Sequence, residues 1–211
     1  MRTESCRPYV LGFGIAALLL TASATSAGTA QGCAAYLRGD YPTALREFLP
    51  DANRGEASAQ LAVGWLYDNG LGVEHDDTTA AKWYLLAAKQ GDARAQQYLG
   101  TMYATGAGVP KDLKLAEHWF RLAAEQGSSG GQFGLGVMYR DGVVVPKDVV
   151  EAYKWFSLAA ISGGNTPEGD QAVAARDAVV AAMTNDQIAG GDTRVKAWKP
   201  PHLMKPADLC K

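Results

Sequence analysis

The sequence predicts an all-α fold, specifically an α-solenoid of helix-turn-helix repeats with a 36-residue period. Aspartate, alanine, aromatic and glycine positions recur at this step, and a period of 20–50 residues is typical of a stacked repeat array. Apolar residues inside each period follow helical spacing, and aspartates precede the expected helices. The recurring positions are Asp40, Asp76, Asp112 and Asp148; Ala44, Ala80, Ala116 and Ala152; Phe48, Tyr84, Phe120 and Phe156; and Gly55, Gly91, Gly127 and Gly163.

Residues 1–27 have the order of a secretory signal peptide: a basic start, an apolar run at 10–20 and then small residues. The apolar run is shorter than the ~20 residues that span a bilayer. We expect cleavage after Ala27, with Ala24 as an alternative, and no stable membrane insertion afterwards. A periplasmic or secreted location follows from this interpretation. The competing interpretation is a buried or membrane-anchoring helix.

The repeat region begins with a partial unit and continues with three complete ones. Residues 33–55 resemble the second half of a degenerate first repeat, and the complete repeats are expected at 57–91, 93–127 and 129–163. In the middle unit, Asp92 and Asp112 can cap two successive helices, and glycine and proline break the chain between them. Each unit is therefore predicted to be a helix–turn–helix pair.

Small and aromatic residues recur together inside the units and predict close helix packing. Gly100 and Ala116 allow neighbouring helices to approach, and Tyr103 and Trp119 are expected to fill the remaining space. We expect Trp119 to be buried between helices of its own and the neighbouring unit, and Lys111 to be exposed.

After residue 164 the period stops, and a C-terminal helical cap is expected over residues 166–197. Pro167 suits the first turn of one helix, and Thr184 with Gln187 has capping-box spacing for a second. Solenoids need such terminal elements to cover an open apolar end. Residues 198–211 contain two adjacent prolines and are expected to form an extended tail.

The run at 95–112, followed by Ala116, Trp119 and two further alanines, resembles the Sel-one-like repeat (SLR) branch of the tetratricopeptide superfamily. The resemblance implies that the first helix of each unit lines a concave surface. Three departures affect the local turns: Gly131 replaces Ala59 and Ala95, Val144 replaces Gly72 and Gly108, and Glu74-His75 replaces Pro-Lys.

Charge and motifs argue against several functional classes. The formal net charge is −2, and without a Lys/Arg-rich run we expect neither nucleic acid nor anionic lipid as a partner. The repeated aspartates are explained as N-caps, and the three histidines share no metal-binding spacing. His75 with Asp76 and Asp77 is the one combination of residues that could form a weak metal site. We therefore expect no metal, no cofactor and no enzymatic activity.

Three cysteines are present, and Cys6 would leave with the signal peptide. Cys33 and Cys210 can then form one disulfide in an exported protein. The extended tail can reach about 40 Å, so it could return along the groove to the first unit. Two free thiols and lipidation of Cys33 are the alternatives.

Positions that vary between units indicate a binding surface on the first helices. Their spacing places them on one stripe, and their aromatic members are of the type favoured at binding hot spots. The alternative is that they pack internally or beneath the tail. The candidate partner-binding residues, called the predicted stripe below, are Trp65, Tyr98, Phe133, Thr101, Val137, Arg140, Leu61 and Gln97.

Together these features predict an exported, monomeric, non-enzymatic adaptor or scaffold that binds a protein or peptide in the bacterial cell envelope. One alternative is a secreted factor that acts on a host. A less favoured alternative is a β-lactam-related hydrolase. The family relatives associated with that activity carry a cysteine pair in each repeat, whereas this chain has none between Cys33 and Cys210.

Overall fold

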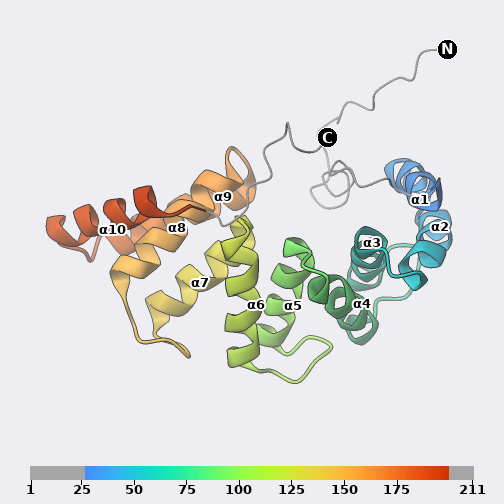
Figure 1. Cartoon of the computed structure of the whole chain (residues 1–211), viewed down its shortest axis with the longest axis horizontal. Helices are drawn as coiled ribbons and strands as arrows, with labels where there is room; N and C mark the ends of the chain where they lie inside the picture. Colours follow the sequence, from blue (N-terminus) through green and yellow to red (C-terminus); the bar gives the residue numbers. More distant parts are fainter. Residues whose placement is uncertain (1–26, 200–211) are drawn as a thin grey trace, which may run out of the picture.

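The computed structural model describes residues 27–199, and these residues form ten helices and no strand. The helices lie along one curved row (Figure 1), and most pack chiefly against their neighbours in sequence. The expected α-solenoid is confirmed. The helices are α1 (Ala27–Leu37), α2 (Tyr41–Asn53), α3 (Ala57–Asp68), α4 (Asp77–Lys89), α5 (Ala93–Thr105), α6 (Leu113–Glu125), α7 (Ser129–Asp141), α8 (Val149–Gly163), α9 (Pro167–Val180) and α10 (Asn185–Ala197).

The repeated aspartates start the second helix of each pair. The side chains of Asp76, Asp112 and Asp148 each accept hydrogen bonds from backbone N–H groups in the first turn of the following helix. Asp40 does the same for α2. These bonds satisfy donors that a helix start otherwise leaves unpaired. Capping therefore explains the aspartates, and they need no catalytic or metal-binding role.

Each helix pair closes by setting a glycine against an aromatic ring. A Cβ atom added at Gly64 would lie 2.8 Å from the ring of Tyr84, and one added at Gly136 would lie 2.6 Å from that of Phe156. Gly100 meets Phe120 in the same way. Only glycine permits this approach, which explains its recurrence inside helices where it lowers intrinsic helix stability.

The first unit is a full helix pair, although its sequence resembles only the second half of a repeat. Its first helix, α1, begins at Ala27, upstream of the expected range 33–55. Gly32 packs against Phe48 in the same glycine–aromatic contact. This pair is 16 residues apart, whereas Gly64 and Tyr84 are 20 apart, because the turn between α1 and α2 is shorter. The shorter turn removes α1 from the 36-residue register.

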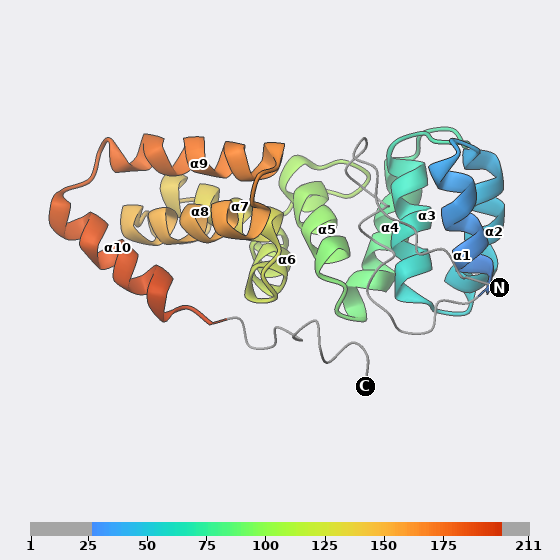
Figure 2. The ribbon, with the colours of Figure 1, turned by 90° about the horizontal axis from the view of Figure 1, so that it is seen from above.

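Helices α9 and α10 both pack on α8, at the opposite end of the row from α1 and α2 (Figure 2). They occupy the range expected for the C-terminal cap, and Thr184 with Gln187 forms the expected capping box at the start of α10. Val195 and Trp198 pack against the apolar cluster that contains Trp155. This end of the solenoid is thereby covered.

Burial of the repeated tryptophans differs from the expectation. Trp119 is only half-buried, beside His118 at a ring-centroid distance of 5.1 Å, so the expectation of a fully buried Trp119 is wrong. Trp155, one repeat later, is 4 % exposed. Trp155 is the more deeply buried of the two because Val195 and Trp198, at the end of α10, pack on its cluster. Lys111 is exposed as expected.

A ladder of glutamines, not anticipated from the sequence, links successive helices, and three of its members are buried: Gln60, Gln96 and Gln132. Gln60 and Gln96 each donate from Nε2 to a backbone oxygen, of Ala52 and Ala88, at 3.1 Å. Their Oε1 atoms accept from Gln90 at 2.7 Å and from Gln126 at 2.8 Å. We call the five residues Gln60, Gln90, Gln96, Gln126 and Gln132 the glutamine ladder.

The glutamine ladder is incomplete in the third repeat. Gln132 is fully buried and donates to Ala124, but its Oε1 has no hydrogen-bond partner among residues 27–199. The position that corresponds to Gln90 and Gln126 is Ser162, whose side chain is shorter. A buried acceptor without a donor lowers stability by about 1–3 kcal/mol.

Replacing Ser162 by glutamine is therefore expected to raise the free energy of unfolding by about 1 kcal/mol. The new Nε2 would donate to the Oε1 of Gln132, as Gln126 does to Gln96. Urea unfolding followed by circular dichroism measures the change. Gln126→Ser is the matched control and should lower stability. A stabilised Gln126→Ser, or an unchanged Ser162→Gln, would contradict the role assigned to the glutamine ladder.

Candidate partner-binding surface

In the first part of the predicted stripe, Trp65 and Tyr98 form a packed aromatic cluster with Tyr84, a buried core residue outside the stripe. The ring centroids of Trp65 and Tyr98 lie 5.5 Å apart, and Tyr98 stacks on Tyr84 at 5.1 Å. Trp65 and Tyr98 are half-buried, whereas Leu61 is fully buried and offers no surface to a partner. Packing therefore buries much of the surface of Trp65 and Tyr98. The expectation that Leu61 contacts a partner is wrong, because Leu61 belongs to the core.

The buried aromatic cluster also explains why an aspartate stands at position 68. The hydroxyl of Tyr84 donates to Asp68 Oδ2 at 3.0 Å. The later repeats have Phe120 and Phe156 at the Tyr84 position and need no such acceptor. Burial raises the pKa of Asp68 and raises that of Tyr98 to about 12. Tyr98 thus stays neutral at physiological pH, and the cluster presents rings and hydroxyls, not phenolate charge.

The second part of the predicted stripe lines a pocket of about 210 Å³. Gln97 and Thr101 come from α5, and Phe133 from α7; the ring of Phe133 packs on Phe156 at 5.4 Å. Phe120 of α6 adds a second aromatic wall. Three residues of the predicted stripe therefore meet at one hollow.

The pocket exists because glycines interrupt the repeat in α7. Gly134 occupies the position that Tyr98 holds one repeat earlier, and Gly130 occupies that of Arg94. The ring of Tyr98 covers Tyr84, but no side chain at 134 covers Phe120, and a Cβ there would lie 2.7 Å from that ring. The amide of Gln97 lies directly over Gly130. The two glycines thus let Gln97 and Phe120 approach α7 closely, and all four residues line the hollow.

Helix α9 completes the pocket with two residues that the repeat pattern did not identify, Glu168 and Gln171. Glu168 is exposed in the first turn of α9 and forms no ion pair among residues 27–199. Among the residues that the structure describes, it is also the only charged one in the lining. Glycines at 130 and 134, where the preceding repeat has Arg94 and Tyr98, are a sequence signal for a hollow, but nothing in the sequence places α9 beside it.

The polar groups of α5 leave acceptor capacity in the pocket. Gln97 Oε1 accepts from the Ser128 hydroxyl at 2.7 Å. Thr101 Oγ1 donates to the backbone oxygen of Gln97 at 3.2 Å, which leaves its own lone pairs open to a ligand. Thr101 is exposed. The site therefore offers oxygen acceptors beside aromatic walls.

The third part of the predicted stripe, Val137 and Arg140, lies outside the pocket. Val137 packs with Phe133 against the core cluster that contains Phe156. The guanidinium of Arg140 donates to both carboxylate oxygens of Asp141, at 2.7 and 2.8 Å, and this hydrogen bonding raises its pKa. Asp141 therefore already offsets the charge of Arg140, which is less suited to a partner carboxylate than the sequence implied.

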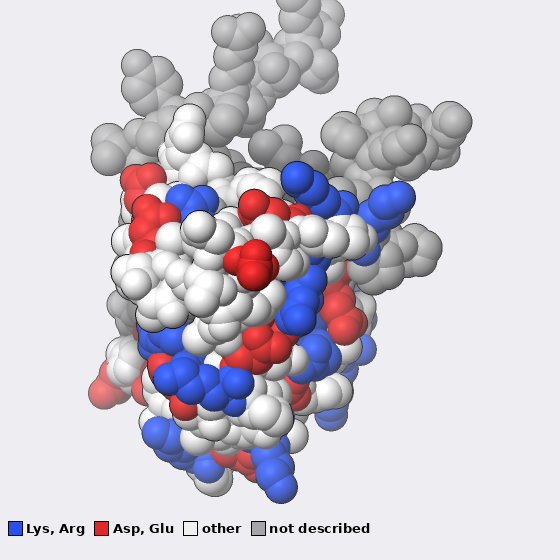
Figure 3. All heavy atoms as spheres, turned by 90° about the vertical axis from the view of Figure 1, so that its left-hand side faces the viewer, with Lys and Arg blue, Asp and Glu red and all other residues white. Residues whose placement is uncertain are grey.

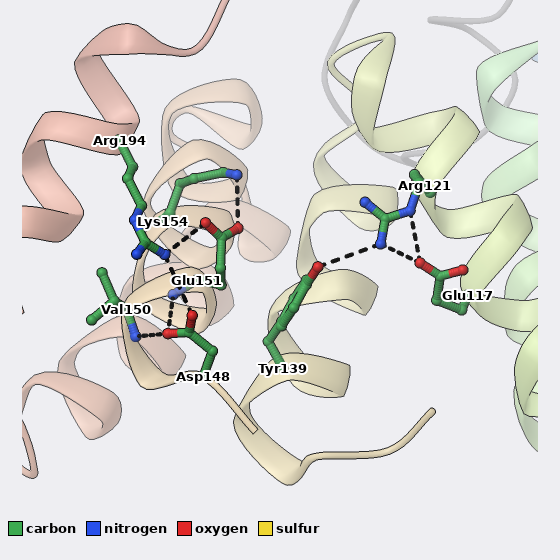
Figure 4. Close-up of polar contacts among 8 residues, drawn as sticks. All are labelled: Glu117, Arg121, Tyr139, Asp148, Val150, Glu151, Lys154 and Arg194. Atoms are coloured by element: carbon green, nitrogen blue, oxygen red, sulfur yellow. Dashed lines mark hydrogen bonds and ion pairs between the residues drawn. The ribbon is translucent and has the colours of Figure 1, made fainter. Parts of the chain in front are cut away.

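Charged residues elsewhere hold helices together. Arg194 of α10 contacts Glu151 at 2.8 Å and Asp148 at 3.4 Å, while Arg121 of α6 bridges Glu117 and the Tyr139 hydroxyl of α7 (Figure 4). Positive and negative side chains are interspersed on the face that includes α9 and α10 (Figure 3). This face carries no broad basic area of the kind that binds nucleic acid.

Within residues 27–199, His75 is the histidine that the sequence places beside two aspartates, Asp76 and Asp77. His75 contacts Asp77 at 3.1 Å and the backbone oxygen of Asp68 at 2.8 Å. No group of three or more metal-ligating side chains occurs in this part of the chain. Nor do its helices include one with the length and apolar character needed to cross a bilayer.

Cys33 lies half-buried in α1, where its Sγ donates to the backbone oxygen of Thr29 at 2.7 Å. Burial raises the pKa of this thiol to about 11. Cys210 lies outside the described residues, as do most of the expected signal peptide and most of the expected tail. The Cys33–Cys210 disulfide therefore stays a prediction.

The raised pKa predicts slow alkylation of reduced Cys33. Because the thiolate is the nucleophile, a shift from 9.0 to about 11 lowers its fraction at pH 8 by roughly 100-fold. Iodoacetamide labelling of a Cys6→Ser, Cys210→Ser variant should be correspondingly slower in the native state than in denaturant. The native rate should also keep rising with pH above 9. Equal rates would contradict the buried thiol.

Comparisons with known proteins agree with the helical architecture. The family model described as "Sel1 repeat" matches residues 57–92, 93–128 and 129–164. A Sel1 repeat protein from Oxalobacter formigenes is 30 % identical with a TM-score of 0.68, over 81 % of this chain and 69 % of that one. A protective antigen present in uropathogenic Escherichia coli, displaying an SLR fold, is 26 % identical with a TM-score of 0.50. That match covers 80 % of this chain and 44 % of the antigen. A search of curated proteins found no match.

Proposed function

Because the chain belongs to the Sel1 repeat family, whose members generally act as protein-interaction scaffolds, we propose that it binds a protein or peptide partner through α3, α5 and α7. The partner would lie along the concave face that these first helices are expected to line. The chain itself would be a monomeric, non-enzymatic adaptor or scaffold. It would carry out this role after export to the bacterial cell envelope.

The pocket beside Phe133 is the observation that carries this proposal. Phe133 and the partly exposed rings of Trp65 and Tyr98 give α3, α5 and α7 a series of rigid aromatic contacts. Such rings supply large contact area at a small entropic cost and dominate many interfaces. Repeat arrays commonly bind through extended surfaces of this kind.

Export is supported by the order of residues 1–27, basic then apolar then small. N-terminal sequencing of protein from the envelope fraction should begin near Gly28, or near Thr25 if the alternative site is used. A mature chain that still begins at Met1 would contradict export. One similar structure is a protective antigen of a pathogen, which is compatible with the alternative of a secreted factor that acts on a host.

The binding face can be tested by photo-crosslinking in cells. A benzoyl-phenylalanine at Thr101, which is exposed on α5, should give a discrete adduct that mass spectrometry identifies. The same residue at Glu125, exposed at the end of α6, is the matched control and should give none. Thr101 is preferred to Tyr98, because the larger benzoyl-phenylalanine at 98 would disturb the stack on Tyr84. Adducts at Glu125 alone, or at neither position, would reject this face.

A further inference from the structure

The pocket has the size of a single side chain. Pockets that bind drug-sized molecules are about 300–1,000 Å³, whereas this one is about 210 Å³. It also lies at the one place where glycines replace the larger residues of the preceding repeat, Arg94 and Tyr98. A partner segment that crosses α5 and α7 could therefore insert one side chain where the repeat itself provides none.

The lining defines the chemistry of that side chain. Phe120 and Phe133 form aromatic walls, and Thr101 provides an oxygen acceptor. Glu168 is the only charged lining residue, with no ion-pair partner in the described part of the chain. Arg94 of α5 is not among the lining residues, and its guanidinium contacts Asp92 at 3.4 Å. A complementary side chain thus needs an apolar stem, a planar end and a positive charge.

We propose that the pocket receives one arginine side chain of the partner, with its guanidinium on the Glu168 carboxylate and its stem between Phe120 and Phe133. This assignment rests on the proposed partner-binding function. Arginine fits better than lysine because the guanidinium stacks on aromatic rings and pairs with a carboxylate through two parallel hydrogen bonds. A purely apolar side chain would remove water from Glu168 without replacing its hydrogen bonds.

The test uses two capped pentapeptides, Gly-Gly-Arg-Gly-Gly and the same peptide with citrulline, the neutral isostere of arginine. Each is titrated into the purified ¹⁵N-labelled protein, and amide chemical shifts are recorded. We expect the arginine peptide to shift the amides of Gly130 and Gly134 saturably, at least threefold more than the citrulline peptide. Glu168→Gln should remove this difference. Equal shifts from both peptides, or shifts confined to other elements, would overturn the proposal.

Filling the pocket provides a second and independent variant. Thr101→Trp places a large ring at the position that Trp65 occupies one repeat earlier, in α3. It should abolish the Gly130 and Gly134 shifts. Thr105→Trp puts the same ring one turn further along α5, at an exposed residue outside the lining, and should leave them intact. Loss of the shifts in both variants, or in neither, would count against the pocket.

The two proposals can fail separately. If a partner crosslinks at Thr101 but the arginine peptide shows no preference for Glu168, the function stands and the arginine assignment is rejected. If the arginine peptide shifts the pocket amides but no partner crosslinks at Thr101, the pocket chemistry stands and the proposed binding face is rejected.

Discussion

Replacing Trp155 by alanine is expected to lower the free energy of unfolding by about 3–5 kcal/mol. Trp155 is 4 % exposed and lies in a cluster with Leu135 and Leu158, against which Val195 and Trp198 pack. Removing the indole would leave a cavity and detach the end of α10 from its apolar contact. Lys154 would also lose its position 4.2 Å from the ring centroid. Urea unfolding monitored by circular dichroism measures the loss.

Trp119→Ala is the matched control, because it makes the same substitution at the same repeat position. Trp119 is half-buried, so its loss should cost only about 1–2 kcal/mol. Equal destabilisation by the two variants would show that the cap does not determine the burial of Trp155. An unchanged stability of Trp155→Ala would contradict the packing of α10 on α8.

Gly108→Ala is expected to lower stability by about 2–5 kcal/mol, through backbone strain and a steric overlap together. Gly108 has a φ of 67°, a left-handed conformation that residues with a Cβ adopt only at a cost. An added Cβ would also overlap the backbone carbonyl of Asp77 at the start of α4. The turn after α5 would then have to move away from the preceding repeat. Thermal and urea unfolding both measure the effect.

Gly127→Ala separates these two contributions. Gly127 also has a positive φ, 84°, but an added Cβ there meets no atom within 4 Å, so only the strain of about 1–2 kcal/mol applies. The converse variant is Val144→Gly. Val144 occupies the register of Gly108 with a φ of 67° and is 47 % exposed, so glycine should stabilise this turn. Equal losses at Gly108 and Gly127 would exclude the overlap.

The Sel1 repeats could be predicted from the sequence because each one uses the same local contacts. An aspartate cap, a glycine against an aromatic ring and a left-handed glycine after the helix recur at fixed spacing. The glutamine ladder recurs at the same period and was equally readable, since Gln60, Gln96 and Gln132 are 36 residues apart. The period alone does not show that these glutamines are buried, because periodic polar residues also suit a solvated face.

The candidate site could be predicted only in part. Gln97, Thr101 and Phe133 were identified from the positions that vary between repeats, and they line the pocket. Variation alone could not separate them from Leu61, which varies because of core packing. Glu168 and Gln171 belong to α9, which follows no repeat pattern, so no spacing related them to the pocket.

The sequence by itself determined the helical repeats, their caps and their stacking order, because a contact repeated every 36 residues leaves a periodic pattern. The tertiary structure decided the features that occur once. It set the shifted register of Gly32 on Phe48, the burial of Trp155 by the end of α10, and the closure of the pocket by Glu168. Each of these depends on a turn length or on a helix outside the period. Such contacts join residues at unrelated spacings, and only the packed chain brings them together.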